Sequence, residues 1–277
     1  MERFIVNEGT DGRKKLIINS LYPEDCCDYA MANNIRSVTL YPGYYTHADL
    51  NPVLKLQDFI EGLILNEKID FGELCQFKKL KFLGALDNKK NIVNLTCFPD
   101  LETLACNVTK RLKGLESCKK LKSLTISYYN PGSKDLAELP FLPSLEHLNV
   151  IKTRIATLDG IERFPGLKKL EIYGAPALKT IRQLKFLPNI DEIWFETCKK
   201  VKDYDTLGGV KPLKKIVLTN SGEIPSLGFV RELPSLKFIS FVGTNVLDGD
   251  ISHCNELKYV GFNDKRHYNH KMKDFKN

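Results

Sequence analysis

The sequence predicts an α/β repeat protein: a curved solenoid with a parallel β-sheet on its concave face and loops and 3-10 turns on its convex face. Two observations predict this fold. A segment with apolar residues at its positions 1, 4 and 6 recurs eleven times between residues 35 and 262, with a mean period of about 22 residues. Between these segments, a second set of apolar residues recurs at a spacing of three.

Each recurring segment predicts one short strand. Positions 4 and 6 are apolar and flank a polar position 5, and this alternation is typical of a strand with one buried face. A period of about 22 residues is too long for a meander of hairpins, so successive strands must run parallel. The segments begin at residues 35, 60, 80, 101, 121, 145, 167, 190, 213, 236 and 257, and the pattern is clearest from residue 101 onward.

The segments that return the chain to the next strand predict tight turns. In the repeat that begins at Leu145, their apolar residues are Ile155, Leu158, Ile161 and Phe164. A spacing of three residues suits 3-10 geometry. A proline precedes six of the strands, where its missing N–H ends a helical turn and its ring directs the preceding residue to extended geometry.

Residues 1–34 precede the repeats and predict an amino-terminal cap. Residues 4–6 and 16–18 are apolar and flank a turn-rich stretch, which indicates a hairpin. Pro23 and the two acidic residues after it indicate the start of a short helix. A cap is expected because a stack of repeats otherwise ends in an exposed apolar face.

The remaining chain divides into a solenoid of about 11 repeats, residues 35–262, and a polar, basic and aromatic carboxy-terminal cap or tail, residues 263–277. The longest interruption between repeats is residues 44–59. We expect a short helix or a projecting loop there.

The repeat itself resembles a known family. Leu145–Val150, followed by Ile155–Phe164, resembles the short leucine-rich repeat of internalins and of the leucine-rich-repeat regulator of protein phosphatase 1. This resemblance implies a protein-binding scaffold, because phosphatase regulators, invasion proteins and toxin-neutralising proteins share it with different surfaces. Position 9 is usually Asn in such repeats, and here it is Thr109, Tyr129, Thr153, Ala175, Cys198, Ser221 and Thr244. We expect their hydroxyl and thiol groups to replace part of the hydrogen bonding that Asn provides.

Composition indicates an ordinary globular chain, with 43% hydrophobic and 27% charged residues. The chain starts without an apolar stretch of signal-peptide length, and it has no apolar run long enough for a membrane span. We therefore expect a cytoplasmic protein that does not enter a membrane and is a monomer when free. Eight cysteines lack any CxxC motif, and in a reducing compartment most of them should be buried thiols.

Catalytic motifs are missing from the sequence, which predicts that the protein is not an enzyme and uses no cofactor or metal. There is no phosphate-binding loop, nucleophile elbow or HExxH motif. The one group of ligand-type side chains is His253, Cys254, His267 and His270, and no carboxylate completes a recognisable metal set. An enzyme with an unrecognised site remains as an alternative, with His147 activating Cys106 or Cys198, although both cysteines occupy structural positions of the repeat.

Binding is better supported, because outward residues at positions 3, 5 and 7 of the strands need not serve the core. The single tryptophan, Trp194, stands at such a position, and aromatic residues among charges of both signs are typical of protein-binding hot spots. The predicted partner-binding residues are Trp194, Tyr173, Glu171, Glu192, Glu196, Lys169, Lys215, Phe238 and His147. A structural alternative is that Trp194 packs on Tyr173 and Val217 and merely covers the sheet.

The sequence thus predicts a non-enzymatic protein–protein interaction module that binds a protein partner through its concave surface, with a regulatory or toxin-neutralising character. The net charge is +7, and the basic excess lies after residue 100. Binding of nucleic acid or another polyanion by the basic surface of residues 101–277 is therefore an alternative. It is the weaker one, because the predicted site also contains three glutamates and no nucleic-acid-binding motif is present.

Overall fold

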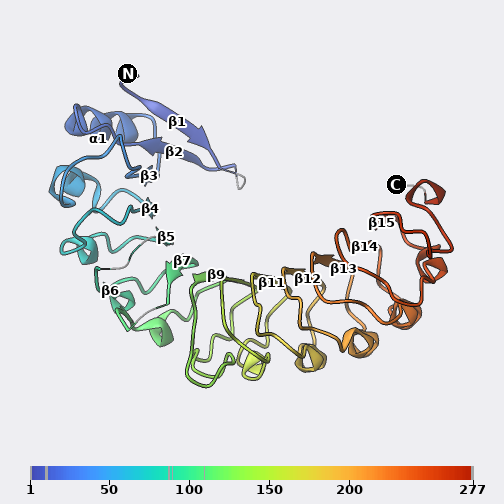
Figure 1. Ribbon diagram of the computed structural model, residues 1–277. Coiled ribbons are helices and arrows are strands. Elements are labelled where there is room, and N and C mark those ends of the chain that lie inside the picture. Colours follow the sequence, from blue (N-terminus) through green and yellow to red (C-terminus); the bar gives the residue numbers. More distant parts are fainter. Residues whose placement is uncertain (1, 10–11, 87, 89, 109, 276–277) are drawn as a thin grey trace. The chain divides into compact units, whose positions relative to one another are not determined.

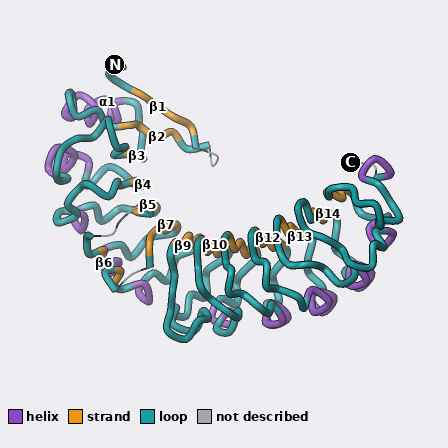
Figure 2. The backbone as a smooth tube through the Cα atoms, viewed as in Figure 1, coloured by secondary structure: helices purple, strands orange, loops and turns teal. Residues whose placement is uncertain are grey.

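The computed structural model describes residues 2–9, 12–86, 88, 90–108 and 110–275. The chain forms two compact units, residues 1–126 and residues 127–277. Within each unit the strands of the repeats lie side by side on the inner side, and 3-10 turns lie on the outer side (Figures 1 and 2). The predicted solenoid of parallel strands and 3-10 turns is confirmed.

The first unit begins with an antiparallel hairpin of β1 (Ile5–Glu8) and β2 (Lys14–Ile17), followed by the helix α1 (Pro23–Ala32). Pro23 and two acidic residues occupy the first turn of α1, and its buried face contains Cys26, Cys27 and Ala30. The strands that follow β2 in the sheet are β3 (Ser37–Thr39), β4 (Gly62–Ile64), β5 (Phe82–Ala85), β7 (Thr103–Asn107) and β9 (Ser123–Ser127).

The first unit also contains a small second sheet that the sequence pattern does not predict. It consists of β6 (Val93–Asn94) and β8 (Leu112–Lys113), which pair in parallel. The interruption at residues 44–59 contains a 3-10 helix, Asn51–Leu56.

The second unit holds strands β10 (His147–Ile151), β11 (Lys169–Tyr173), β12 (Glu192–Glu196), β13 (Lys215–Thr219), β14 (Phe238–Ser240) and β15 (Tyr259–Gly261). They are parallel, and each residue pairs with the equivalent residue of the next repeat, so that Trp194 lies between Glu171 and Val217. Each strand starts two residues after the start of its repeat, as the apolar pattern predicts.

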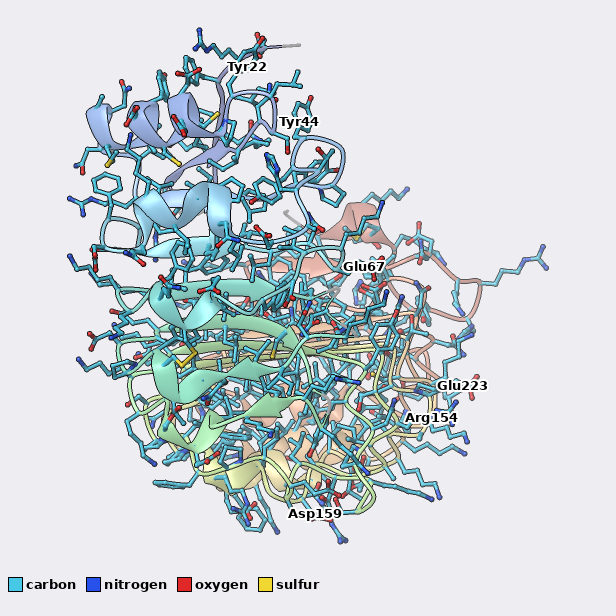
Figure 3. The ribbon with its side chains drawn as sticks, turned by 90° about the vertical axis from the view of Figure 1, so that its left-hand side faces the viewer. Tyr22, Tyr44, Glu67, Arg154, Asp159 and Glu223 are labelled. Atoms are coloured by element: carbon cyan, nitrogen blue, oxygen red, sulfur yellow. A yellow bond between two sulfur atoms is a disulfide. The ribbon has the colours of Figure 1, made fainter. Side chains whose placement is uncertain are left out.

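The outer side of the repeats is built from short 3-10 helices. In addition to Asn51–Leu56, those of the described residues are Leu74–Gln76, Leu95–Cys97, Leu115–Ser117, Ile161–Arg163, Arg182–Phe186, Tyr204–Gly209, Gly228–Glu232, Ser252–Cys254 and Met272–Asp274. In the second unit, Asp159 lies on this outer side, whereas Arg154 and Glu223, which follow β10 and β13, lie along one edge (Figure 3).

The core runs between the strands and the 3-10 helices of each unit. Inward positions of the strands, such as Leu148 and Val150, have no exposed surface, and neither has Phe164 of the return segment. Complete burial of such side chains is the main source of stability in a repeat stack, because each repeat covers the apolar face of its neighbour.

In several repeats the residue at position 9 bonds backbone groups of neighbouring repeats through its hydroxyl group, and these residues form a hydroxyl column. Thr244 Oγ1 donates to the carbonyl oxygen of Leu218 at 2.7 Å and accepts from the N–H of Ser221 at 2.9 Å. Ser221 Oγ in turn donates to Phe195 O, and Thr153 Oγ1 donates to Tyr129 O. The hydroxyl groups of Thr153, Ser221 and Thr244 thus provide part of the hydrogen bonding expected from Asn at this position, whereas Ala175 has no polar side-chain group to do so. Thr109 lies outside the described residues.

Cysteine chemistry differs between the units. Six of the eight cysteines are free and buried. Cys75 and Cys97 form a disulfide that joins two successive 3-10 helices of the first unit, with their Cα atoms 5.3 Å apart (Figure 3). The expectation of buried thiols holds for the six and not for this pair.

Candidate functional site

Trp194 is held between two lysines on the inner face of the second unit. Lys169 Nζ lies 5.2 Å and Lys215 Nζ 4.5 Å from the centroid of the indole ring, and the indole Nε1 donates to Glu192 Oε1 at 2.9 Å. Strands β11 and β13 supply the lysines because position 3 of one repeat lies diagonally beside position 5 of the next. Cation–π contacts and one hydrogen bond thus fix the orientation of a half-buried aromatic ring.

Carboxylates hold the two lysines over the ring. Lys169 Nζ lies 3.0 Å from Glu171 Oε1 and 3.9 Å from Glu192 Oε2, and Lys215 Nζ lies 3.1 Å from Glu192 Oε1. Each side chain is therefore part of a network rather than of an isolated pair, which reduces the conformational entropy that remains to be lost when a partner covers the surface.

Glu171 is the most deeply buried charge of the network, with 7% of its surface exposed. Its carboxylate accepts hydrogen bonds from His147 Nε2 at 2.6 Å and from the hydroxyl of Tyr173 at 3.1 Å. Burial alone would raise the pKa of Glu171, but the hydrogen bonds from His147 and Lys169 and the positive charge of Lys169 outweigh burial and lower it to about 2. Burial, and then the adjacent Glu171 charge, raise the pKa of Tyr173 to about 12.

An aromatic platform lies at the other end of the site. The rings of Phe238 and Tyr259 stack with their centroids 4.2 Å apart and an angle of 8° between them, and Lys215 Nζ lies 4.9 Å from the centroid of Phe238. Tyr259 is not among the residues predicted from the sequence. The sequence signal that could have identified Tyr259 is its place at position 3, the same outward position that Phe238 occupies in the preceding repeat.

Eight of the nine predicted partner-binding residues are joined by contacts on β10 to β14: His147, Glu171, Lys169, Tyr173, Trp194, Glu192, Lys215 and Phe238. The ninth, Glu196, is exposed at the end of β12 and lies next to Tyr173 in the strand register. The rows of outward residues expected from the repeat, Glu171 with Trp194 and Val217, and Tyr173 with Glu196 and Thr219, are present in the register.

The groups considered for catalysis have structural partners. Burial raises the pKa of the Cys106 and Cys198 thiols to about 12, and Cys198 Sγ lies against the carbonyl oxygens of Ile172 and Glu196. His267 Nε2 lies 2.9 Å from Val246 O. In the described part of the chain, no group of three or more His, Cys, Asp or Glu side chains is placed to hold a metal ion.

The 3-10 helices and α1 are short. No helix among the described residues combines the length and the hydropathy that a bilayer span requires.

Comparison with known proteins gives likeness in structure only. No protein-family model matches the sequence, and no curated protein matches it significantly. An internalin, InlF, from Listeria monocytogenes aligns with a TM-score of 0.60 and 18% sequence identity. The alignment covers 76% of this chain and 62% of the InlF chain, so this chain spans less than two thirds of that protein. Internalin C2 of the same species aligns with a TM-score of 0.43 and 16% identity, covering 61% of this chain and 84% of that one.

The functional domain of InlJ from L. monocytogenes, which includes a cysteine ladder, aligns with a TM-score of 0.43 and 17% identity, covering 84% of this chain and 60% of that one. The likeness to InlF shows a leucine-rich-repeat fold similar to that of internalins.

Proposed function

We propose that this chain is a non-enzymatic protein–protein interaction module that binds one partner protein through the inner strands β10 to β14, with Trp194 at the centre of the contact. The observation that carries this proposal is the fixed indole ring between Lys169 and Lys215. A large aromatic side chain contributes most to binding when its orientation is set before the partner arrives, because little side-chain entropy is then lost.

The surrounding charges suit recognition rather than turnover. Lysines and glutamates alternate around Trp194, so that a partner with complementary charges would be oriented as it docks. A concave surface of this kind covers a convex part of its partner. We therefore propose a regulatory or toxin-neutralising action, in which the module blocks the covered surface of a partner.

We propose that the module acts in the cytoplasm as a monomer. Six buried thiols fit a reducing compartment, whereas the Cys75–Cys97 disulfide requires oxidising conditions. Rapid alkylation of free thiols in lysed native cells shows whether Cys75 and Cys97 are free or bonded in the native compartment. Free Cys75 and Cys97 support the cytoplasm, and a bonded pair places the protein in an oxidising compartment.

The test of binding is capture of a stoichiometric partner from the native host by the wild-type chain and by variants. Trp194→Ala should weaken capture by at least about 2 kcal/mol, or about thirtyfold in Kd, while the melting temperature stays nearly unchanged. Phe186→Ala is the matched control, because Phe186 is an exposed aromatic residue on the outer side. It should bind like the wild type.

Two results would contradict the proposal. If Trp194→Ala lowers the melting temperature and leaves capture intact, Trp194 covers the sheet and the partner binds elsewhere, with residues 44–59 the next surface to test. If the captured material is nucleic acid, and its affinity falls steeply with the logarithm of salt concentration, the basic surface of residues 101–277 is the functional one.

A further inference from the structure

A row of charged side chains follows one rim of the sheet, at position 2 of each repeat, immediately before the strands. Position-2 lysines pair with position-2 carboxylates of the preceding repeat. The pairs are Lys81 with Glu61 and Lys122 with Glu102 in the first unit, and Lys168 with Glu146 and Lys214 with Asp191 in the second, at N···O distances of 2.9 to 3.1 Å.

The backbone fixes this spacing. Within each unit, the carbonyl oxygen of a position-2 residue accepts the N–H of the position-2 residue in the next repeat, as Glu146 does from Lys168 and Asp191 from Lys214, both at 2.8 Å. Side chains at the rim therefore lie one strand spacing apart. Alternation of acid and base along the row lets each lysine find a carboxylate and leaves the paired part of the rim without a net charge.

The alternation stops at the carboxy-terminal end of the second unit. After Lys214 the next two rim residues are Lys237 and Lys258, which continue the same backbone ladder, with N···O distances of 2.9 Å. Both side chains are exposed. Among the residues that the structure describes, neither lysine has a carboxylate within ion-pair distance, and Glu256, two residues before Lys258, forms no ion pair with it.

This lysine doublet directly adjoins the aromatic platform. Lys237 precedes Phe238, and Lys258 precedes Tyr259, so the two like charges stand beside the two stacked rings. Lys215 approaches Phe238 from the neighbouring strand. Tyr259 lies over Gly261, where a Cβ atom would come within 3.0 Å of the tyrosine ring. A flat apolar surface and an uncompensated pair of positive charges thus share one corner of the sheet.

We propose that Lys237, Lys258 and the Phe238–Tyr259 platform bind an acidic segment of the protein partner, with two neighbouring carboxylates over the lysines and an apolar side chain on the platform. This inference rests on the proposed function and adds the chemistry of the partner to it. The segment supplies the negative charges that the alternating rim lacks at this point.

An acidic peptide fits this corner better than a nucleic acid does. Strand β12 continues the surface and presents two glutamates. Glu192 is already paired with Lys169 and Lys215, and the exposed Glu196 repels a phosphate backbone that extends toward Trp194. The uncompensated charge is confined to two lysines, whereas nucleic-acid surfaces extend positive charge over many phosphates. A short segment with two carboxylates matches the doublet without meeting the glutamates.

The test uses the full chain and a fluorescein-labelled peptide, Glu-Glu-Tyr-Glu-Glu-Phe, whose anisotropy reports binding at moderate salt concentration. The wild type should bind it at least about tenfold more tightly than the analogue with glutamine for glutamate, and the double variant Lys237→Glu, Lys258→Glu should lose at least about tenfold. Lys168→Glu is the matched control, since it reverses the charge of a rim lysine in the paired part of the row. It should change the affinity less than about twofold. Melting curves verify that each variant is folded.

Equal losses from Lys168→Glu and the doublet variant, or equal affinity for the glutamate and glutamine peptides, would overturn the proposal. Tighter, doublet-dependent binding of a twelve-nucleotide oligothymidylate would replace the acidic peptide by nucleic acid. Partner capture distinguishes the failure of the proposed binding function from the failure of the acidic-segment proposal. If Trp194→Ala abolishes partner capture and the doublet variant does not, the proposed binding function stands and the acidic-segment proposal fails. If only the doublet variant loses peptide binding, the acidic-segment proposal is supported, even where Trp194→Ala leaves partner capture intact.

Discussion

His147 Nε2 on β10 lies 2.6 Å from Glu171 Oε2 on β11, and this contact ties the first strand of the site to the network around Trp194. Because a carboxylate only accepts hydrogen bonds, the imidazole nitrogen must donate. Glu171 is thereby satisfied on one oxygen by His147 and on the other by Tyr173 and Lys169. Its charge is a stabilising element of the fold as well as of the surface.

We expect Glu171 to contribute stability that depends on pH. Its pKa is lowered from 4.5 to about 2 in the folded protein, so the contribution is present above the unfolded value and is lost as the pH falls through about 2. At neutral pH, Glu171→Gln should therefore lower the free energy of unfolding by about 3 kcal/mol, since one pKa unit corresponds to about 1.4 kcal/mol. Urea unfolding at several pH values measures the difference.

Glu196→Gln is the control for this experiment, because Glu196 is an exposed glutamate one strand away. It should change stability by less than about 0.5 kcal/mol. A difference between Glu171→Gln and the wild type that stays constant from pH 7 down to pH 2 would show that the carboxylate charge is not what stabilises.

Removal of a hydroxyl group from the hydroxyl column at position 9 should lower the stability of the fold. Thr244 is 3% exposed and both donates to Leu218 O and accepts from Ser221 N. Thr244→Val keeps the shape but leaves a buried carbonyl and a backbone N–H without this partner, so we expect a loss of about 1–3 kcal/mol in the free energy of unfolding. Thr244→Ser retains the hydroxyl and should lose less than Thr244→Val. Equal losses in chemical denaturation would mean that the methyl group, not the hydrogen bonds, matters.

The strands of the second unit were predictable because a strand with one buried face must alternate, as Leu148, Asn149 and Val150 do. Trp194 was predictable as an outward residue for the same reason. The network around it was not, because the partners of Lys169 and Lys215 depend on side-chain rotamers rather than on position in the repeat. The small sheet of β6 and β8 was missed because two-residue strands carry no period.

The Cys75–Cys97 disulfide was predictable in principle. The two cysteines lie 22 residues apart, about one repeat, so stacking of successive repeats brings them together. The absence of CxxC motifs and the scatter of the cysteines along the sequence nevertheless favour thiols, and only the repeat period relates Cys75 to Cys97. The alternation of charges at position 2 is likewise visible in the sequence. Which of these lysines have an ion-pair partner, as Lys168 and Lys214 do and the Lys237–Lys258 doublet does not, depends on the structure.

The disulfide predicts a redox-dependent stability. Closing a loop of this length restricts the unfolded chain, so the double variant Cys75→Ser, Cys97→Ser should be less stable than the oxidised wild type by about 2–4 kcal/mol. Adding a thiol reductant to the wild type should remove most of that difference. Denaturant midpoints with and without reductant measure it, and identical midpoints for the variant and the unreduced wild type would mean that the bond does not form in solution.

Thr197 is the first residue after β12, the strand that holds Trp194. Position 8 has a positive φ in successive repeats: Lys152, Gly174, Thr197, Asn220 and Gly243. Thr197, with φ of 58°, carries the β-branched side chain that this conformation disfavours most, whereas the neighbouring repeats have Gly or Asn. Thr197→Asn should therefore raise the free energy of unfolding by about 1 kcal/mol, which urea unfolding measures.

Thr197→Ala is the control, because alanine loses the branch without gaining the tolerance of asparagine for left-handed geometry. Asparagine should stabilise more than alanine, and since Thr197 is outside the Trp194 network, Thr197→Asn should capture the partner as the wild type does. If alanine and asparagine stabilise equally, relief of side-chain crowding and not backbone conformation explains the gain.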